Sequence, residues 1–340
     1  MFNNFTNLMF LITLILGSII SISSNSWLGA WMGLEINLLA FIPLLTNLKN
    51  LPSTESSLKY FIVQALASTT LLFTILMLSF NLNSLVEYNP YLNIILNSSL
   101  LMKMGAAPFH SWFPEVMEGL TWITGFILMT WQKIAPMILL SYCMFHKFIL
   151  FCIILSISIG SIGGFNQTNL RSLMAYSSIN HLGWMLSSIF ISMNYWLIYF
   201  LFYTIISLSI ILVFHQLNIF YFNQIFSSLN NFPLMKFVMF CNFLSLGGLP
   251  PFTGFLPKWI IIQSLSEKSE SNMTLMTIMV MLTLITLFFY IRITYSAFMI
   301  QSTQILWNKM FYSNISKLTM MLNFFSILGL ISITLIYSIL

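Results

Sequence analysis

The chain has 340 residues, of which 59% are hydrophobic and 6% are charged, and its mean hydropathy is +0.93. Soluble globular domains carry about 25% charged residues, so this composition excludes a soluble globule and predicts a polytopic membrane protein. The net charge is +5, from 12 lysines and arginines against 7 glutamates. Three cysteines lie in apolar runs without metal-binding or C-x-x-C spacing, so neither a disulfide nor a metal site is indicated.

At about 20 apolar residues for each span, the sequence predicts about eleven transmembrane helices. They lie near residues 5–22, 27–46, 57–80, 91–120, 121–143, 148–165, 169–190, 194–220, 235–263, 273–299 and 320–340. The first stretch lacks the basic flank of a signal peptide and is interpreted as a span. The connections near 221–234 and 300–319 suit interfaces or the membrane surface, and no stretch predicts a soluble domain.

The fourth and ninth predicted helices carry the same interruption, G-x-x-P-F-x-x-x-x-P. It runs from Gly105 to Pro114 and, 143 residues later, from Gly248 to Pro257. Proline removes a backbone donor and clashes with the preceding turn, so both helices should unwind there. Irregular backbone at membrane depth needs protein or water around it. Chance is the alternative, because Gly, Pro and Phe are common in membrane helices.

The two interrupted helices are five apart, and this odd offset means that they cross the membrane in opposite directions. We therefore predict two inverted five-helix repeats, about 5–143 and about 148–299, and a C-terminal helix at about 320–340. Interrupted segments at corresponding positions of two halves point to the pathway of a transporter.

Basic residues near the loops predict the orientation. Six lie near loops on the side of the N-terminus: Lys49, Lys59, Arg171, Lys236, Lys309 and Lys317. The other side has only Lys147 and Lys268. The positive-inside rule then places the N-terminus inside and the C-terminus outside.

Four charged residues fall near the middle of predicted spans: Glu35, Lys103, Lys133 and Lys258. A charge at that depth costs about 2.5–3.5 kcal/mol, so four would cost on the order of 10 kcal/mol unless they are paired, hydrated or neutralised. Removal from water disfavours a lysine ammonium, whereas a carboxylate within about 4–6 Å favours it. A buried lysine beside a glutamate is therefore a two-state proton site.

Our hypothesis is that Glu35 pairs with Lys103, that Lys133 receives the proton and that Lys258 passes it on. Pro136 would leave the carbonyl of Gln132 free for water. The alternatives are static ion pairs or lysines that reach the headgroups.

His181 is a further relay candidate, because imidazole titrates near neutrality. Polar neighbours that could support a water chain are Ser177, Ser178, Asn180 and Ser187. A satisfied core histidine is the alternative interpretation.

Other ionisable residues have less central roles in this interpretation. His110 is a relay or a backbone cap within the first break, and Arg292 snorkels or pairs with a loop acid. The remaining assignments are His146 and His215 as interfacial residues, and Glu115 and Glu118 as acids of an entry funnel.

Five stretches resemble the chain 2 family of mitochondrial NADH:ubiquinone oxidoreductase, respiratory complex I. They are SNSWLGAWMGLEINLLAFIPLL (25–46), STESSLKYFIVQALAS (53–68), KMGAAPFHSWFPEVMEGL (103–120), NQTNLRSLMAYSSINHLGWM (166–185) and FLSLGGLPPFTGFLPKW (243–259). The similarity covers nearly the whole chain and is weakest at 81–100, 215–235 and 265–320. The chain is similar to the short animal form, which lacks three N-terminal helices of bacterial relatives.

The resemblance implies an antiporter-like, proton-pumping subunit of the membrane arm in the inner mitochondrial membrane. The family's midplane Glu, the Lys before one broken helix, the central Lys and the Lys at the second broken helix match Glu35, Lys103, Lys133 and Lys258. NADH, FMN, iron–sulfur clusters and ubiquinone are expected in other subunits, with no cofactor in this chain. Expected partners are other membrane-arm subunits, including antiporter-like chains, and phospholipids, but no nucleic acid.

Two other functions remain open from the residues alone. One is a stand-alone cation/proton antiporter of the same fold, and the other is a structural scaffold. Short loops and few polar residues for a cation cage favour a subunit over an independent carrier.

Overall fold

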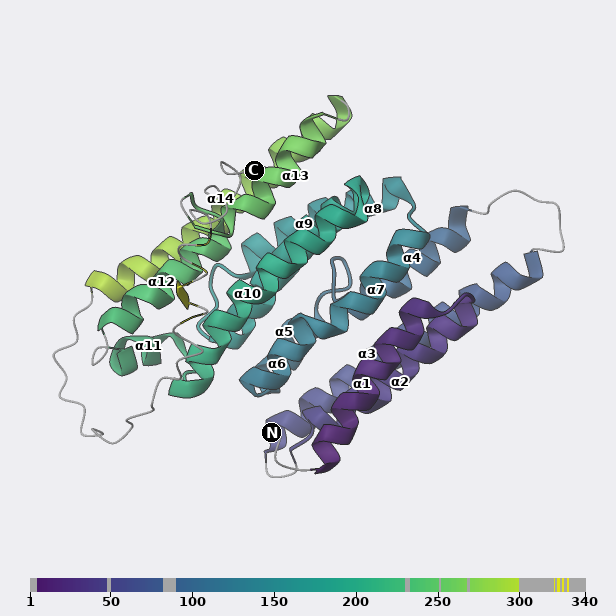
Figure 1. The fold of residues 1–340 in the computed structure, drawn as a ribbon, viewed down its shortest axis with the longest axis horizontal. Helices are drawn as coiled ribbons and strands as arrows, with labels where there is room; N and C mark the ends of the chain where they lie inside the picture. Colours follow the sequence, from purple (N-terminus) through teal and green to yellow (C-terminus); the bar gives the residue numbers. More distant parts are fainter. Residues whose placement is uncertain are drawn as a thin grey trace. The chain divides into compact units, whose positions relative to one another are not determined.

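The structure, a computed structural model, describes residues 5–47, 50–81, 90–229, 233–250, 252–267 and 270–299, and five helical positions between 321 and 329. Within these ranges it is nearly all helical, with fourteen α-helices and one isolated antiparallel bridge between Asn169 and Tyr221 (Figure 1). The predicted all-α class is confirmed. The chain divides into two compact units, residues 1–156 and 157–340, and the division falls within α8 (His146–Gly163).

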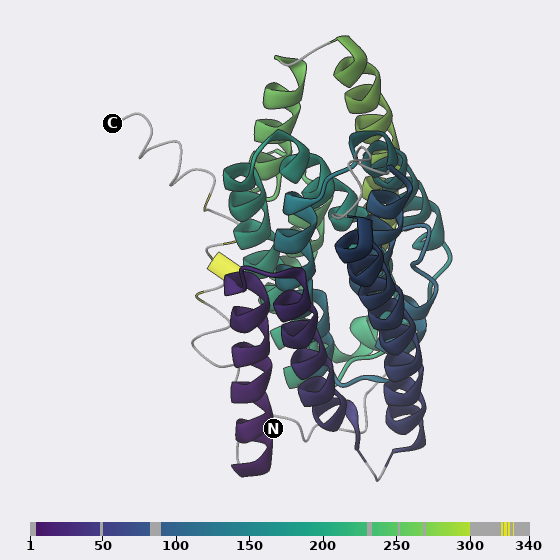
Figure 2. The same ribbon diagram turned by 90° about the vertical axis from the view of Figure 1, so that its right-hand side faces the viewer.

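In the first unit, α1 (Phe5–Ser23) and α2 (Trp27–Leu45) form a close hairpin, seen as two purple helices in Figure 2. Small residues allow membrane helices to approach closely. A Cβ atom on Gly33 would lie 2.5 Å from the backbone nitrogen of Ser21, and one on Gly17 would lie 2.8 Å from that of Asn37. These two glycines therefore set the spacing of the hairpin.

The first unit continues with five helices. They are α3 (Leu51–Asn81), α4 (Pro90–Met104), α5 (Trp112–Gly119), α6 (Trp122–Met129) and α7 (Trp131–Tyr142). The predicted span 91–120 is thus α4 and α5 with a break between them. The predicted continuous span 121–143 is interrupted at Thr130, whose hydroxyl and amide both donate to the Phe126 carbonyl, at 2.7 and 3.0 Å. Such back-bonding commonly distorts helices.

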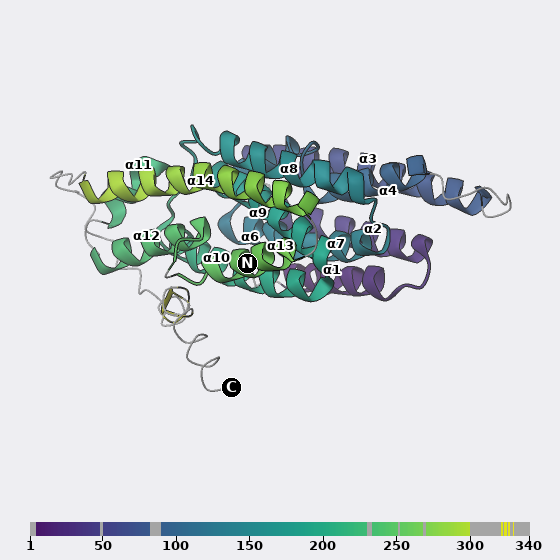
Figure 3. The same cartoon turned by 90° about the horizontal axis from the view of Figure 1, so that it is seen from above.

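The second unit surrounds α9 (Leu170–Ile191), of which 18 of 22 residues are buried. Its other helices are α10 (Met193–Leu217), α11 (Phe222–Leu229), α12 (Pro233–Gly247), α13 (Phe255–Ser266) and α14 (Glu270–Met299). Helix α14 packs along α12 and α13 (Figure 1, Figure 3). The second predicted break separates α12 from α13, whereas the short helix α11 lies where only a connection was predicted.

Seven helical stretches of the described ranges, with α6 and α7 counted together as one, are long and apolar enough to cross a membrane. Eleven spans were predicted, and the number is not confirmed. The pieces of the broken helices are individually too short to qualify, and most of the predicted helix 320–340 lies outside the described residues.

Candidate functional site

The first break begins with a C-cap in which Gly105 has φ +72°. Its amide donates to the Met102 carbonyl at 3.2 Å, and the Ala106 amide donates to the Leu101 carbonyl at 3.1 Å. This is the Schellman pattern, which favours glycine because only glycine adopts the left-handed conformation without a steric cost. The indole Nε1 of Trp112, from the start of α5, also donates to the Met102 carbonyl at 3.2 Å. The interrupted backbone is therefore satisfied by the protein.

The second break repeats this cap at the equivalent positions. Gly248 has φ +82°, and its amide donates to the Ser245 carbonyl at 3.0 Å. The Leu249 amide donates to the Leu244 carbonyl at 3.3 Å. The shared motif thus produces the same helix end in both units, although Pro251 of the motif lies outside the described residues.

Lys258 crosses the second break and binds its backbone. Its ammonium group donates to the carbonyls of Leu246 and Gly247 at 3.2 and 2.9 Å, and only 6% of the residue is exposed. The ammonium nitrogen also lies 5.8 Å from the centroid of a Trp184 ring. A lysine after the break therefore serves as a charged cap for the helix before it, where cations are favoured.

Lys103, in the last turn of α4, is 7% exposed and borders a small polar cavity. The cavity has about 10 Å³ for the centre of a water molecule, roughly the room that one water needs. Its polar walls are Asn37, Tyr60, Gln64, Lys103 and Gln132, with Pro136 beside them. Gln64 donates to the Lys103 carbonyl at 3.2 Å, and Gln132 donates to Asn37 at 3.0 Å. Helices α2, α3, α4 and α7 thus meet at one hydrogen-bonded site.

Glu35 lies on α2 and is half-buried. Its carboxylate interacts electrostatically with Lys103, but no ion pair within 4.0 Å joins the two in the described part of the chain. The predicted pairing of Glu35 with Lys103 therefore stays a prediction, with an electrostatic interaction between them but no ion pair within 4.0 Å in this conformation. Glu35 Oε1 is buried without a hydrogen-bond partner among the described residues, so a water or a proton would satisfy it.

Lys133 is almost completely buried on α7, with 1% exposed. Its ammonium nitrogen lies 5.2 Å from the centroid of the Phe113 ring. A Cβ atom on Gly105 would lie 3.0 Å from the Phe113 Cβ, so the same phenylalanine packs on the first break. Phe113 therefore joins Lys133 to the break in the first unit.

His181 lies beside the second break. It is 5% exposed, its Nδ1 is 2.8 Å from the Tyr199 hydroxyl, and it lines a second cavity, of about 10 Å³, together with Leu246 and Pro257. Trp184, which faces Lys258, follows it by three positions on α9. The structure therefore brings His181 and Lys258 to the same break.

Buried tyrosines extend this region, and the sequence analysis missed them. The Tyr199 hydroxyl contacts His181, the Tyr203 ring lies 5.1 Å from the His181 ring, and the hydroxyls of Tyr203 and Tyr290 lie near Ser178 and Ser177. Two of the serines proposed to support a water chain are therefore next to hydroxyl groups. A tyrosine in an apolar helix is usually a core residue, so no sequence signal distinguished these three.

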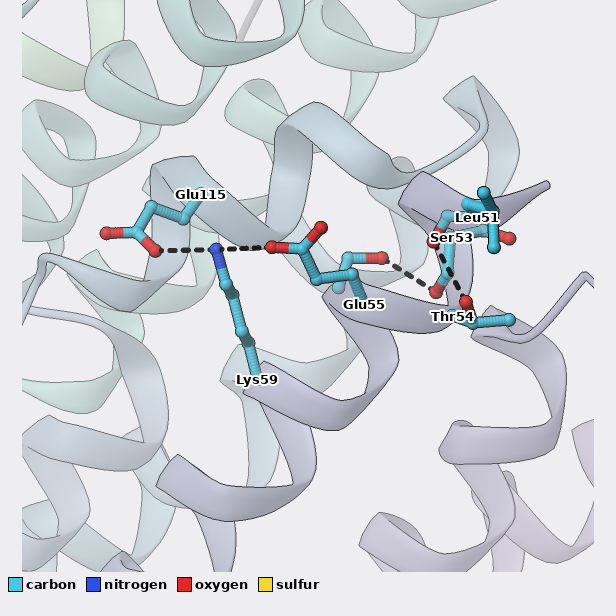
Figure 4. Close-up of polar contacts among 7 residues, drawn as sticks. Leu51, Ser53, Thr54, Glu55, Lys59 and Glu115 are labelled. Carbon is cyan, nitrogen blue, oxygen red and sulfur yellow. Dashed lines mark hydrogen bonds and ion pairs between the residues drawn. The ribbon is translucent and has the colours of Figure 1, made fainter.

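Several further ionisable residues are half-buried or exposed. His110 Nδ1 is 3.1 Å from the Pro108 carbonyl oxygen, which fits the cap interpretation. His146 and His215 are exposed at the ends of α8 and α10. Glu115 is paired with Lys59 at 3.2 Å, and Lys59 also contacts Glu55 at 3.1 Å (Figure 4). Within the described ranges, no group of three or more potential metal ligands occurs.

Residues 24–286 match the model of the family described as NADH:quinone oxidoreductase/Mrp antiporter, TM. The chain is 55% identical to NADH-ubiquinone oxidoreductase chain 2 of Anopheles gambiae over 336 residues, covering 98% of each chain. It is 56% identical to the protein of the same name from Aedes aegypti, covering 98% of this chain and 99% of that one. The chain belongs to the NADH-ubiquinone oxidoreductase chain 2 family.

Solved structures share the fold of this chain 2 family member at low sequence identity. A chain of respiratory complex I from Thermus thermophilus matches with a TM-score of 0.82 and 20% identity, covering 96% of this chain and 79% of that chain. A chain of the Mrp complex from Dietzia sp. matches with a TM-score of 0.72 and 16% identity, covering 85% and 59%. The antiporter-like fold is therefore shared well beyond the chain 2 family.

Proposed function

We propose that this chain 2 family member translocates protons as a core membrane-arm subunit of NADH:ubiquinone oxidoreductase in the inner mitochondrial membrane. The observation that carries the proposal is the burial of Lys103 and Lys258 at two matching helix breaks, without an ion-pair partner among the described residues. Lysines buried in apolar spans without a carboxylate partner are costly, and a proton site at each break gives a reason for keeping them that the capping role of Lys258 alone does not.

In the first unit, the site would hold a proton on Lys103 or on Glu35. The polar cavity beside Lys103 has room for about one water, and the Glu35 oxygen, which does not line this cavity, would need a water or a proton of its own. Lys133, behind Phe113, would be the next acceptor. Because no direct Glu35–Lys103 contact is present, the transfer requires water or a side-chain movement.

In the second unit, proton loss from Lys258 would change the helix break. The ammonium form stabilises the carbonyl ends of α12 by two charge-assisted hydrogen bonds. A neutral amine binds these carbonyls more weakly, so the break should loosen when Lys258 gives up its proton. His181 and Tyr199 lie at the same break and would exchange protons with it.

The setting follows from the family. The N-terminus would face the matrix and the C-terminus the intermembrane space, as the basic residues predict. NADH, FMN, iron–sulfur clusters and ubiquinone would be held by other subunits, and this chain would contact other antiporter-like chains and phospholipids. Electron transfer would therefore drive the protons from a distance.

Replacement of Lys258 by Met in the assembled complex tests the proposal, with Lys147→Met on an exposed helix end as the matched control. We expect Lys258→Met to abolish or sharply reduce proton pumping per NADH oxidised in proteoliposomes, while Lys147→Met leaves it unchanged. A normal proton-to-electron ratio in fully assembled Lys258→Met complex would favour the scaffold function.

A stand-alone cation/proton antiporter is the second candidate, because the matching family model includes Mrp antiporters. Purification of the tagged chain under mild detergent separates the two functions. Recovery with a large NADH-oxidising complex is expected, and recovery of the chain alone with cation-dependent proton exchange would support the antiporter.

A further inference from the structure

A cavity in the described part of the second unit lies at the ends of α8, α9 and α14. Its volume is about 530 Å³, within the range of small-molecule sites. Its walls include the aromatic rings of Phe165, Tyr221 and Phe289, the amides of Gln167 and Asn223, and the guanidinium-bearing Arg292. No part of the proton-transfer proposal uses this cavity.

Backbone hydrogen bonds hold the rim of the cavity in place. The Leu170 amide donates to the Phe220 carbonyl at 2.9 Å, and the Phe222 amide donates to the Thr168 carbonyl at 3.0 Å. These bonds join the segment before α9 to the segment before α11. The Gln224 side-chain oxygen accepts from the Phe220 and Tyr221 amides at 2.8 and 3.1 Å. The rim is therefore preformed.

Arg292 lacks an acidic partner within the second unit. No ion pair is found for it among the residues that the structure describes. From residue 157 to 340 the sequence has only two acids, Glu267 and Glu270. Glu270 begins α14, 22 residues before Arg292, which corresponds to about 33 Å along a helix. The predicted pairing with a loop acid of this unit is therefore not available to Arg292.

Arg292 lies on an exposed, largely apolar face of α14. Large apolar residues exposed on this face are Met281 (66%), Leu284 (54%), Phe288 (53%), Ile291 (41%) and Tyr295 (62%). Arg292 follows Phe288 by four positions and precedes Tyr295 by three, so the three side chains are neighbours on the helix surface. Acyl chains can cover the apolar stripe, and a tyrosine near a helix end suits the headgroup level.

We propose that this cavity binds the headgroup of an anionic phospholipid, with the phosphate on the Arg292 guanidinium and the acyl chains along the exposed face of α14. Guanidinium and phosphate form charge-assisted, often bidentate hydrogen bonds. Gln167 and Asn223 supply further donors for headgroup oxygens. Arg171, stacked at 4.8 Å on Phe220 beside the rim, adds positive potential. The sequence predicts that the loop before α9, which lines the cavity, lies on the more basic side of the membrane, where anionic lipid binds preferentially. Binding does not depend on proton translocation.

The test measures bound lipid in the purified complex with Arg292→Gln, Arg292→Lys and the control Lys147→Gln, an exposed lysine at the start of α8. Each complex is exchanged into detergent micelles that contain either cardiolipin or phosphatidylcholine, and retained lipid is quantified by native mass spectrometry. A density map of the unsubstituted complex with cardiolipin shows what lies against Arg292.

We expect lipid density in the cavity, and a loss of cardiolipin affinity of at least about fivefold in Arg292→Gln, as for removal of one basic contact. Arg292→Lys should lose less, Lys147→Gln should lose nothing, and phosphatidylcholine should bind weakly. Three results would each overturn the proposal. They are unchanged cardiolipin binding in Arg292→Gln, binding of phosphatidylcholine equal to that of cardiolipin, and an acidic side chain of a neighbouring subunit in contact with Arg292. If Arg292→Gln does not assemble, the density map and Arg292→Lys still decide it.

Discussion

Individual residues at the two breaks carry different tasks. Gly248 supplies the left-handed turn, and Lys258 covers it with its side chain. A Cβ atom on Gly248 would lie 2.9 Å from the Lys258 Cδ, whereas one on the neighbouring Gly247 would meet nothing closer than 3.4 Å. A Cβ atom would therefore crowd the Lys258 side chain at Gly248, whereas Gly247 has room for one.

We expect Gly248→Ala to destabilise the second break by about 1–3 kcal/mol, because it adds a left-handed non-glycine residue. It should also displace Lys258 and lower the proton-to-electron ratio. Gly247→Ala is the control and should keep both thermal stability and pumping. If the two variants behave alike in thermal unfolding and in proteoliposomes, the described role of Gly248 is wrong.

Gln64 supports the first break through the Lys103 carbonyl. Gln64→Leu leaves this buried carbonyl without its donor, at a cost of about 1–3 kcal/mol. We expect a lower thermal unfolding temperature of the complex and reduced pumping. The same substitution at the exposed Gln263 should have neither effect. Equal unfolding temperatures for Gln64→Leu and the unsubstituted complex would contradict this contact.

At the scale of elements, the sequence predicted both breaks because proline and glycine act locally. The motif fixed their position within a few residues, and each break begins at its predicted glycine. It could not predict that Lys258 folds back onto α12, since this depends on the direction of a side chain across the turn. The distortion at Thr130 was missed because threonine is common in continuous membrane helices.

Helix α5 is held against α3 by packing as well as by charge. The Lys59 ammonium contacts Glu115 and Glu55, but all three side chains are at least 44% exposed. By contrast, a Cβ atom on Gly119 would lie 2.4 Å from the Pro52 carbonyl oxygen. Exposed ion pairs contribute little and are screened by salt.

Glu115→Gln should therefore leave the yield of assembled complex nearly unchanged, whereas Gly119→Ala should reduce it clearly. Blue native electrophoresis of both variants measures the yield. A larger loss for Glu115→Gln than for Gly119→Ala would show that the ion pair, rather than the close packing, holds α5 in place.

At the scale of the whole molecule, the burial of charged side chains is the feature that distinguishes a proton-translocating subunit from a purely structural one. The burial of Lys103, Lys133 and Lys258 could be predicted from the sequence, because each of these lysines lies within a long apolar run. Their partners could not, since Trp184, Phe113 and the tyrosines around His181 come from helices that only the fold brings together. The sequence also could not predict the distance between the Glu35 and Lys103 side chains, because nearness along a predicted path does not determine contact.

A density map of the assembled complex at a resolution that shows ordered water tests the central claim most directly. Conduction through these side chains predicts water in the cavity beside Lys103, bonded to Gln132 or Glu35, and water between Lys258 and His181 at the second break. Dry, tightly packed side chains at both places in every state of the working enzyme would contradict it.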